Sequence, residues 1–183
     1  MREEVTALLE NRNELLTITY FKIQELFDKK YGENALVLME IGTFFEVYEV
    51  NNEKEKIGKA KEIAELLNIQ LTRKNKSILE NSKENPIMAG VPAISFEKHL
   101  ARIIAEQKYT IAIIKQKGTP PNVSRYLDVV VSPGTNFDFV VEQDDNFITS
   151  IVIDQIRGNY LIGYSAIDVT TAKCYYNEVF GTN

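Results

Sequence analysis

The stretch Ile41-Gly42-Thr43-Phe44-Phe45-Glu46-Val47-Tyr48-Glu49-Val50 decides the fold of this chain. Its glycine predicts a turn, and the aromatic and β-branched residues that follow predict a β-strand. Successive side chains of a strand point to opposite faces, so we expect Phe45 and Val47 to anchor the strand in a core. Phe44 and Glu46 are then left together on the other face.

An aromatic ring beside a carboxylate has two interpretations. The ring can stack on a nucleic-acid base, which is worth about 1–3 kcal/mol whatever the base, while the acid contacts the edge of that base. The same alternation is also typical of ordinary cross-strand packing, with the carboxylate in solvent. The pattern of Phe44 and Glu46 alone leaves both interpretations open.

Helical and strand patterns alternate around this stretch. Such alternation predicts an α/β domain, a mixed β-sheet flanked by helices, that ends near residue 140. Asn51-Asn52 is expected to cap the third of its helices. The helices are predicted over 3–11, 14–31, 53–67 and 95–107, and the strands over 35–41, 43–50, 69–72, 109–115 and 126–131, with an exposed loop over 73–86.

The pattern changes after Asp144-Asp145-Asn146. Three strand-like runs separated by short turns, over 147–156, 159–168 and 172–180, predict a β-meander. A lone meander has little to bury its faces against. We therefore expect a first domain over 1–140, and over 141–183 the start of a second domain whose remainder is absent.

Composition restricts the class of protein. The 183 residues are 44% hydrophobic and 26% charged, as in ordinary globular proteins. One cysteine, Cys174, excludes an internal disulfide framework, and with a single histidine, His99, it makes a zinc site improbable. No signal peptide or membrane span is evident, so we expect a cytoplasmic protein. The net charge of −5 arises mostly in the last quarter of the chain.

Four separated segments together resemble the amino-terminal part of the bacterial mismatch-recognition protein family MutS, and the likeness covers roughly residues 14–180. The order and approximate spacing of the four match the family. The segments are Ile41–Glu46, Leu71–Lys74, Pro86-Ile87-Met88-Ala89-Gly90-Val91-Pro92 and Val130–Thr135. The resemblance implies a mixed α/β mismatch-recognition domain, followed by the first strands of a connector domain with a ribonuclease-H-like core.

The resemblance also implies roles for single residues. Phe44 is expected to wedge from the minor groove beside a mispaired or unpaired base of double-stranded DNA, and Glu46 to hydrogen-bond to that base. Met88 would lie near the DNA, and Lys74 and Arg125 would contact phosphates. We further expect Glu46 to be neutral in the complex, because a carboxylate beside phosphates is favourable if it is protonated.

The family resemblance extends to the whole protein. It implies a larger, homodimeric, nucleoid-associated protein with an ATPase that uses ATP and Mg²⁺ and lies downstream of this chain. No Gly-x-x-x-x-Gly-Lys-Ser/Thr loop occurs in these 183 residues, so we expect no catalysis and no cofactor here. Thr43 stands where the family commonly has an acid, and residues 1–13 and 52–56 look like additions.

Two functions of other classes compete with this prediction. Asp154 and Asp168 lie on neighbouring predicted strands, and a ribonuclease-H-like nuclease uses strand carboxylates to hold two metal ions. The other alternative is a protein-interaction module in which an exposed Phe44 contacts a partner protein.

Overall fold

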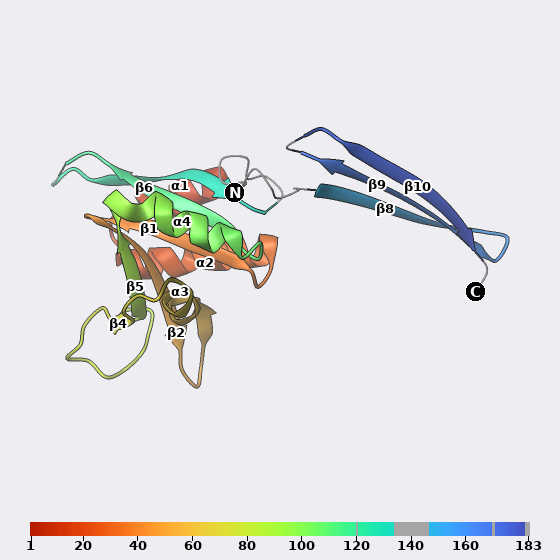
Figure 1. Cartoon of the computed structure of the whole chain (residues 1–183). Helices are drawn as coiled ribbons and strands as arrows, with labels where there is room; N and C mark the ends of the chain where they lie inside the picture. The colour runs from red at the N-terminus through yellow and green to blue at the C-terminus, as the bar shows by residue number, and fades with distance from the viewer. Residues whose placement is uncertain (120, 134–146, 170, 182–183) are drawn as a thin grey trace. The chain divides into compact units, whose positions relative to one another are not determined.

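The chain forms two compact units, Met1–Ser132 and Pro133–Asn183, each described here by itself (Figure 1). The computed structural model describes residues 1–119, 121–133, 147–169 and 171–181. The predicted domain boundary near residue 140 lies outside the described residues. No helix in the described ranges combines the length and the apolar character that crossing a membrane requires.

The first unit alternates helices and strands, as the sequence predicts. Its helices are α1 (Arg2–Glu10), α2 (Leu16–Tyr31), α3 (Ala60–Leu67) and α4 (Phe96–Ala105), the last preceded by a 3₁₀ turn (Ala93–Ser95). Its strands are β1 (Ala35–Ile41), β2 (Phe44–Asn51), β3 (Lys56–Gly58), β4 (Thr72–Arg73), β5 (Ile87–Pro92), β6 (Thr110–Lys117) and β7 (Ser124–Val131).

These strands form one mixed sheet. Among the described residues its order is β4-β5-β2-β1-β6-β7, with β3 paired to the remaining length of β2. The pair β1–β6 is parallel, whereas β1–β2 and β2–β5 are antiparallel. The predicted α/β class with a mixed sheet is therefore confirmed.

Helices cover both faces of the sheet. On one face, Tyr20, Phe21 and Phe27 of α2 pack with Val37 and Met39 of β1 in a fully buried core. The opposite face packs against α3 and α4, whose inward residues are Ile63, Ala64, Leu67, Phe96, Leu100 and Ile103. Strand β2 is thus sandwiched along most of its length, because its residues from Phe45 to Val50 are buried.

The predicted helix over 53–67 is wrong in its first half. Asn52 caps no helix: its side-chain oxygen accepts the backbone N–H groups of Lys54 and Glu55, both at 2.8 Å, and closes a tight turn. The chain then returns as β3, and α3 begins only at Ala60. Strand β5 was not predicted either, although it lies at the centre of a family-like segment.

The second unit is an antiparallel three-stranded meander within the described residues. Its strands β8 (Phe147–Ile156), β9 (Asn159–Asp168) and β10 (Cys174–Gly181) follow the predicted runs. Every residue of β8 and β10 is exposed. The ribonuclease-H-like core remains a prediction.

The nuclease alternative is wrong for Asp154 and Asp168. In the β8–β9 register Asp168 of β9 pairs with Phe147 of β8. Asp154 lies seven residues further along β8 than Phe147. At about 3.3 Å per residue the two carboxylates start more than ~20 Å apart, whereas two-metal sites hold ions ~4 Å apart. Asp168 is fully buried and accepts a hydrogen bond from Thr171. No group of three or more metal-binding side chains occurs in the described part of the chain.

Candidate nucleic-acid interface

The turn before Phe44 is held by a side chain from a distant strand. Gly42 has φ +62°, a left-handed conformation that favours glycine. The side-chain amide of Gln116 in β6 forms two hydrogen bonds with the backbone of this glycine. The Gly42 N–H donates to Gln116 Oε1 at 3.1 Å, and Gln116 Nε2 donates to the Gly42 carbonyl at 2.6 Å. Thr43 is held through its carbonyl, which accepts from Ala93 N at 2.8 Å.

The two neighbouring phenylalanines face opposite environments. Phe45 is 4% exposed and its ring stacks on Phe96 of α4, with centroids 3.6 Å apart and planes 15° from parallel. Phe44 is 44% exposed. The predicted alternation is confirmed, and the buried ring fixes the strand that presents the exposed one.

Glu46 lies on the same face as Phe44 but is far less accessible, at 9% exposure. The Tyr48 hydroxyl donates to its Oε2, and the Lys74 ammonium lies 3.5 Å from the same oxygen. Lys74 also donates to the Tyr48 hydroxyl at 3.1 Å. The predicted phosphate contact Lys74 thus lies within reach of the predicted base contact Glu46.

Electrostatics keep the Tyr48 hydroxyl protonated. Burial raises the pKa of Tyr48 far above its usual value, and the negative charge of Glu46 raises it further.

Burial lowers the pKa of Arg125 from its ordinary value. Arg125 Nε donates to the backbone carbonyl of Glu40 at 3.0 Å, which ties this guanidinium to the strand next to β2.

The strand registers, together with the contacts of Lys74 with Glu46 and Tyr48, bring the five predicted site residues to one face of the sheet. Residues directly opposite one another on paired strands share a face. Tyr48 is opposite Met88, and Arg125 is opposite Gln116, on the same face as the core residues Ile114 and Leu127. The set is Phe44, Glu46, Lys74, Met88 and Arg125. Met88 packs partly buried against the core, so it offers less surface than the prediction implies.

The sequence prediction missed three residues of this site: Tyr48, Gly90 and Gln116. Tyr48 was foreseeable, because it follows Glu46 by two positions and therefore shares its face. Gly90 is opposite Glu46 on β5, and a Cβ added there would lie 3.4 Å from Glu46 Cγ. The same Cβ would lie 3.3 Å from the Phe45 carbonyl oxygen, so the glycine allows β5 to lie close to β2 beside Glu46. Gln116 carries no local signal, since its partner is 74 positions away.

The basic run beside β4 is only partly available to a ligand. Arg73 turns inward and donates to the carbonyls of Ile78 and Leu79, so it holds the loop that follows. Asn85, buried within this loop, donates to the carbonyls of Ile78 and Glu80 at 3.1 Å each. Lys74 and Lys76 remain exposed.

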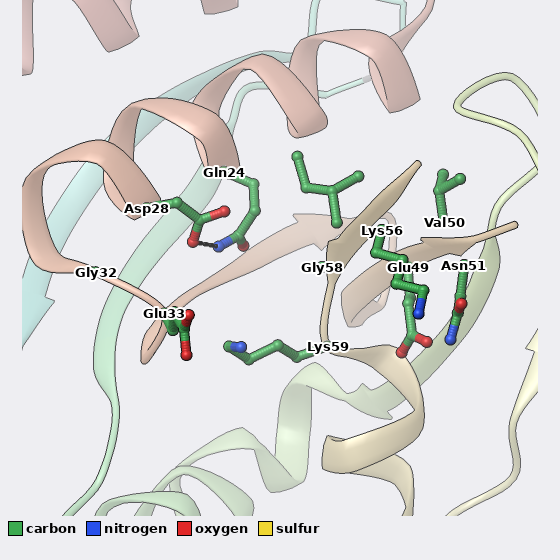
Figure 2. Close-up of a pocket in the computed structure, with 11 residues that line it drawn as sticks. Gln24, Asp28, Gly32, Glu33, Glu49, Val50, Asn51, Lys56, Gly58 and Lys59 are labelled. Atoms are coloured by element: carbon green, nitrogen blue, oxygen red, sulfur yellow. Dashed lines mark hydrogen bonds between the residues drawn. The ribbon is translucent and has the colours of Figure 1, made fainter. Parts of the chain in front are cut away.

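A cavity of about 450 Å³ lies at the other end of β2, away from Phe44 (Figure 2). Three of its polar side chains have hydrogen-bond partners within the chain. Gln24 Nε2 donates to Asp28 at 2.8 Å, and Glu49 accepts the Lys61 backbone N–H at 2.8 Å. Burial raises the pKa of Asp28. None of the five predicted site residues lines this cavity.

Comparison with known proteins identifies the family of the chain. The family model described as MutS domain I matches residues 20–140. The chain belongs to the MutS family. It is 30% identical to a MutS homologue of Acanthamoeba polyphaga mimivirus, over 93% of this chain and 16% of that protein.

Bacterial relatives are similar to the chain over a slightly shorter stretch. The DNA mismatch repair proteins MutS of Halothermothrix orenii and Chlorobium phaeobacteroides are 27% and 29% identical, each over 82% of this chain and 16% of their own length. The chain therefore spans about a sixth of the relatives that it matches.

Proposed function

We propose that this chain recognises mispaired or unpaired bases in double-stranded DNA, as the first step of mismatch repair. Phe44 enters from the minor groove and stacks beside the defective base, and Glu46 hydrogen-bonds to it. The observation that carries the proposal is an exposed ring on a strand whose neighbouring ring, Phe45, is buried and stacked in the core.

A rigidly held wedge distinguishes a mismatch from a sound duplex by the cost of deformation. Unstacking a sound base step costs a few kcal/mol, and a mismatch has already lost part of its pairing and stacking. Phe44 recovers part of the cost by stacking, about 1–3 kcal/mol. The Phe45–Phe96 stack and the two hydrogen bonds between Gln116 and Gly42 hold the backbone on both sides of Phe44.

In the free protein, cations on the same face offset the negative charge of Glu46. Lys74 lies 3.5 Å from Glu46, and Arg125 is tied to the neighbouring strand. In the proposed complex both cations lie near the phosphates on either side of the wedge. Binding through them weakens with salt and carries no sequence information. Glu46 is proposed to be protonated in the complex, so Glu46→Gln is expected to bind mismatched DNA at least as well as wild type.

The remaining proposals concern parts beyond the interface. The meander is proposed to be the start of a connector domain of ribonuclease-H-like fold. The whole protein is proposed to be a homodimer whose ATP and Mg²⁺ are bound outside this chain, so that this part is non-catalytic.

The test compares mismatched and matched duplexes of equal length at one stated salt concentration, using the full-length protein. Phe44→Ala is expected to lower affinity for the mismatched duplex about 10- to 100-fold and to leave the weak, salt-sensitive binding of the matched duplex unchanged. Tyr126→Ala is the control, because Tyr126 is 38% exposed and lies on the opposite face of the sheet.

Two results would contradict the proposal. A Phe44→Ala variant that keeps its preference for the mismatch excludes the wedge. A Phe44→Ala variant that binds DNA normally but no longer binds a partner protein would instead support the protein-interaction module.

A further inference from the structure

The two carboxylate oxygens of Glu46 have different surroundings. Tyr48 and Lys74 both interact with Oε2. Oε1 accepts no hydrogen bond from any residue that the structure describes, and it is not among the buried side-chain atoms that lack a partner. Solvent therefore reaches Oε1, and a ligand at this face meets that oxygen first.

Tyr48 is placed by the core and not by the site. Its ring is fully buried and meets the edge of Tyr20 at a centroid distance of 4.9 Å. The hydroxyl therefore has a fixed position, whereas Lys74, with a side chain 40% exposed, reaches Oε2 from a loop. Tyr48 alone donates a hydrogen bond to Oε2 among the described residues, and its ring is held by the core, whereas Lys74 contributes an ion pair.

We infer that Tyr48 is the positioning residue of the site: its hydroxyl holds Oε2 and thereby presents Oε1 to the base. This inference rests on the proposed function. A carboxylate has a broad terminal torsion, so without a fixed donor it samples many orientations. A group held in one orientation loses less entropy when it binds than one that must be ordered first.

A merely structural role for the hydroxyl makes a different prediction. In that case Tyr48→Phe would lower stability but would affect mismatched and matched DNA equally. Tyr20→Phe is the matched control, because the Tyr20 hydroxyl is also buried but donates to the Val37 carbonyl at 2.9 Å and not to Glu46. Both variants remove one oxygen atom from a buried ring.

The experiment is a double-mutant cycle in the full-length protein. Affinities for mismatched and matched duplexes are measured for Tyr48→Phe, Glu46→Ala and the double variant, with Tyr20→Phe alongside. Tyr48→Phe is expected to weaken mismatch binding about 3- to 10-fold and to leave matched binding unchanged. It is expected to add nothing in the Glu46→Ala background, since its effect passes through that carboxylate.

The inference is overturned if Tyr48→Phe leaves mismatch binding intact, or weakens it equally with and without Glu46, or acts no differently from Tyr20→Phe. Including Phe44→Ala separates this outcome from failure of the proposed function. If Phe44→Ala erases the mismatch preference and Tyr48→Phe does not lower it, only the role of Tyr48 is wrong. If Phe44→Ala has no effect, the wedge itself is wrong.

Discussion

Gly90→Ala is expected to damage the site through a single methyl group. Gly90 lies opposite Glu46, and the new Cβ would lie 3.3 Å from the Phe45 carbonyl oxygen and 3.4 Å from Glu46 Cγ. The carbonyl belongs to a paired strand and cannot move alone. The β2–β5 pairing must therefore open by a few tenths of an ångström beside Glu46. That shift would disturb the Glu46 carboxylate, which interacts with Tyr48 and Lys74.

The net effect on stability is a balance of two terms. Overpacking costs about 1–3 kcal/mol, and replacing glycine by alanine returns about 0.4–1 kcal/mol by restricting the unfolded chain. We expect a loss of about 1 kcal/mol in the free energy of unfolding, which lowers Tm by roughly 3–5 °C for a unit of this size. Loss of one hydrogen bond from Glu46 would weaken mismatch binding by about tenfold.

Thermal melts followed by circular dichroism, together with the duplex-binding assay, measure both effects of Gly90→Ala. Gly163→Ala is the control, because Gly163 lies in β9 with no atom within 4 Å of an added Cβ. That variant is expected to melt no lower than wild type. The reasoning is refuted if Gly90→Ala melts at or above the wild-type temperature and binds mismatched DNA normally.

Two further predictions test contacts elsewhere in the first unit. Gly58→Ala is expected to lower the free energy of unfolding by about 3 kcal/mol or more, because Gly58 has φ +86° and the new Cβ would overlap the Tyr48 carbonyl oxygen. Urea unfolding measures this loss. A loss smaller than that of Gly90→Ala would contradict the prediction. Burial raises the pKa of Glu62, but hydrogen bonds from Lys108 and Tyr109 outweigh it and hold that pKa below 4.5. The stability from this group is therefore complete above pH 4.5 and is lost as pH falls through the lower folded value. Glu62→Gln should lower stability at neutral pH, with a difference from wild type that shrinks on acidification; a difference independent of pH would count against it.

The sequence alone determined the features that depend on local periodicity. Alternation on β2 correctly separated Phe45, which is 4% exposed, from Phe44, which is 44% exposed. The apolar stripes of α2 and α4 and the three strands of the meander were also predictable, because their patterns repeat within a few residues. The family-like segments identified a MutS domain, and residues 20–140 match its domain I.

Tertiary structure alone decided which distant residues complete the site. Gln116 reaches Gly42 across 74 positions, and Lys74 reaches Tyr48 across 26, through strand pairings that no local pattern records. The same cause explains the failed helix over 53–67, where the turn at Asn52 and pairing with β2 prevailed over helical periodicity. It also explains why Asp154 and Asp168, on adjacent strands, lie far apart: an antiparallel register places them at opposite ends of the hairpin.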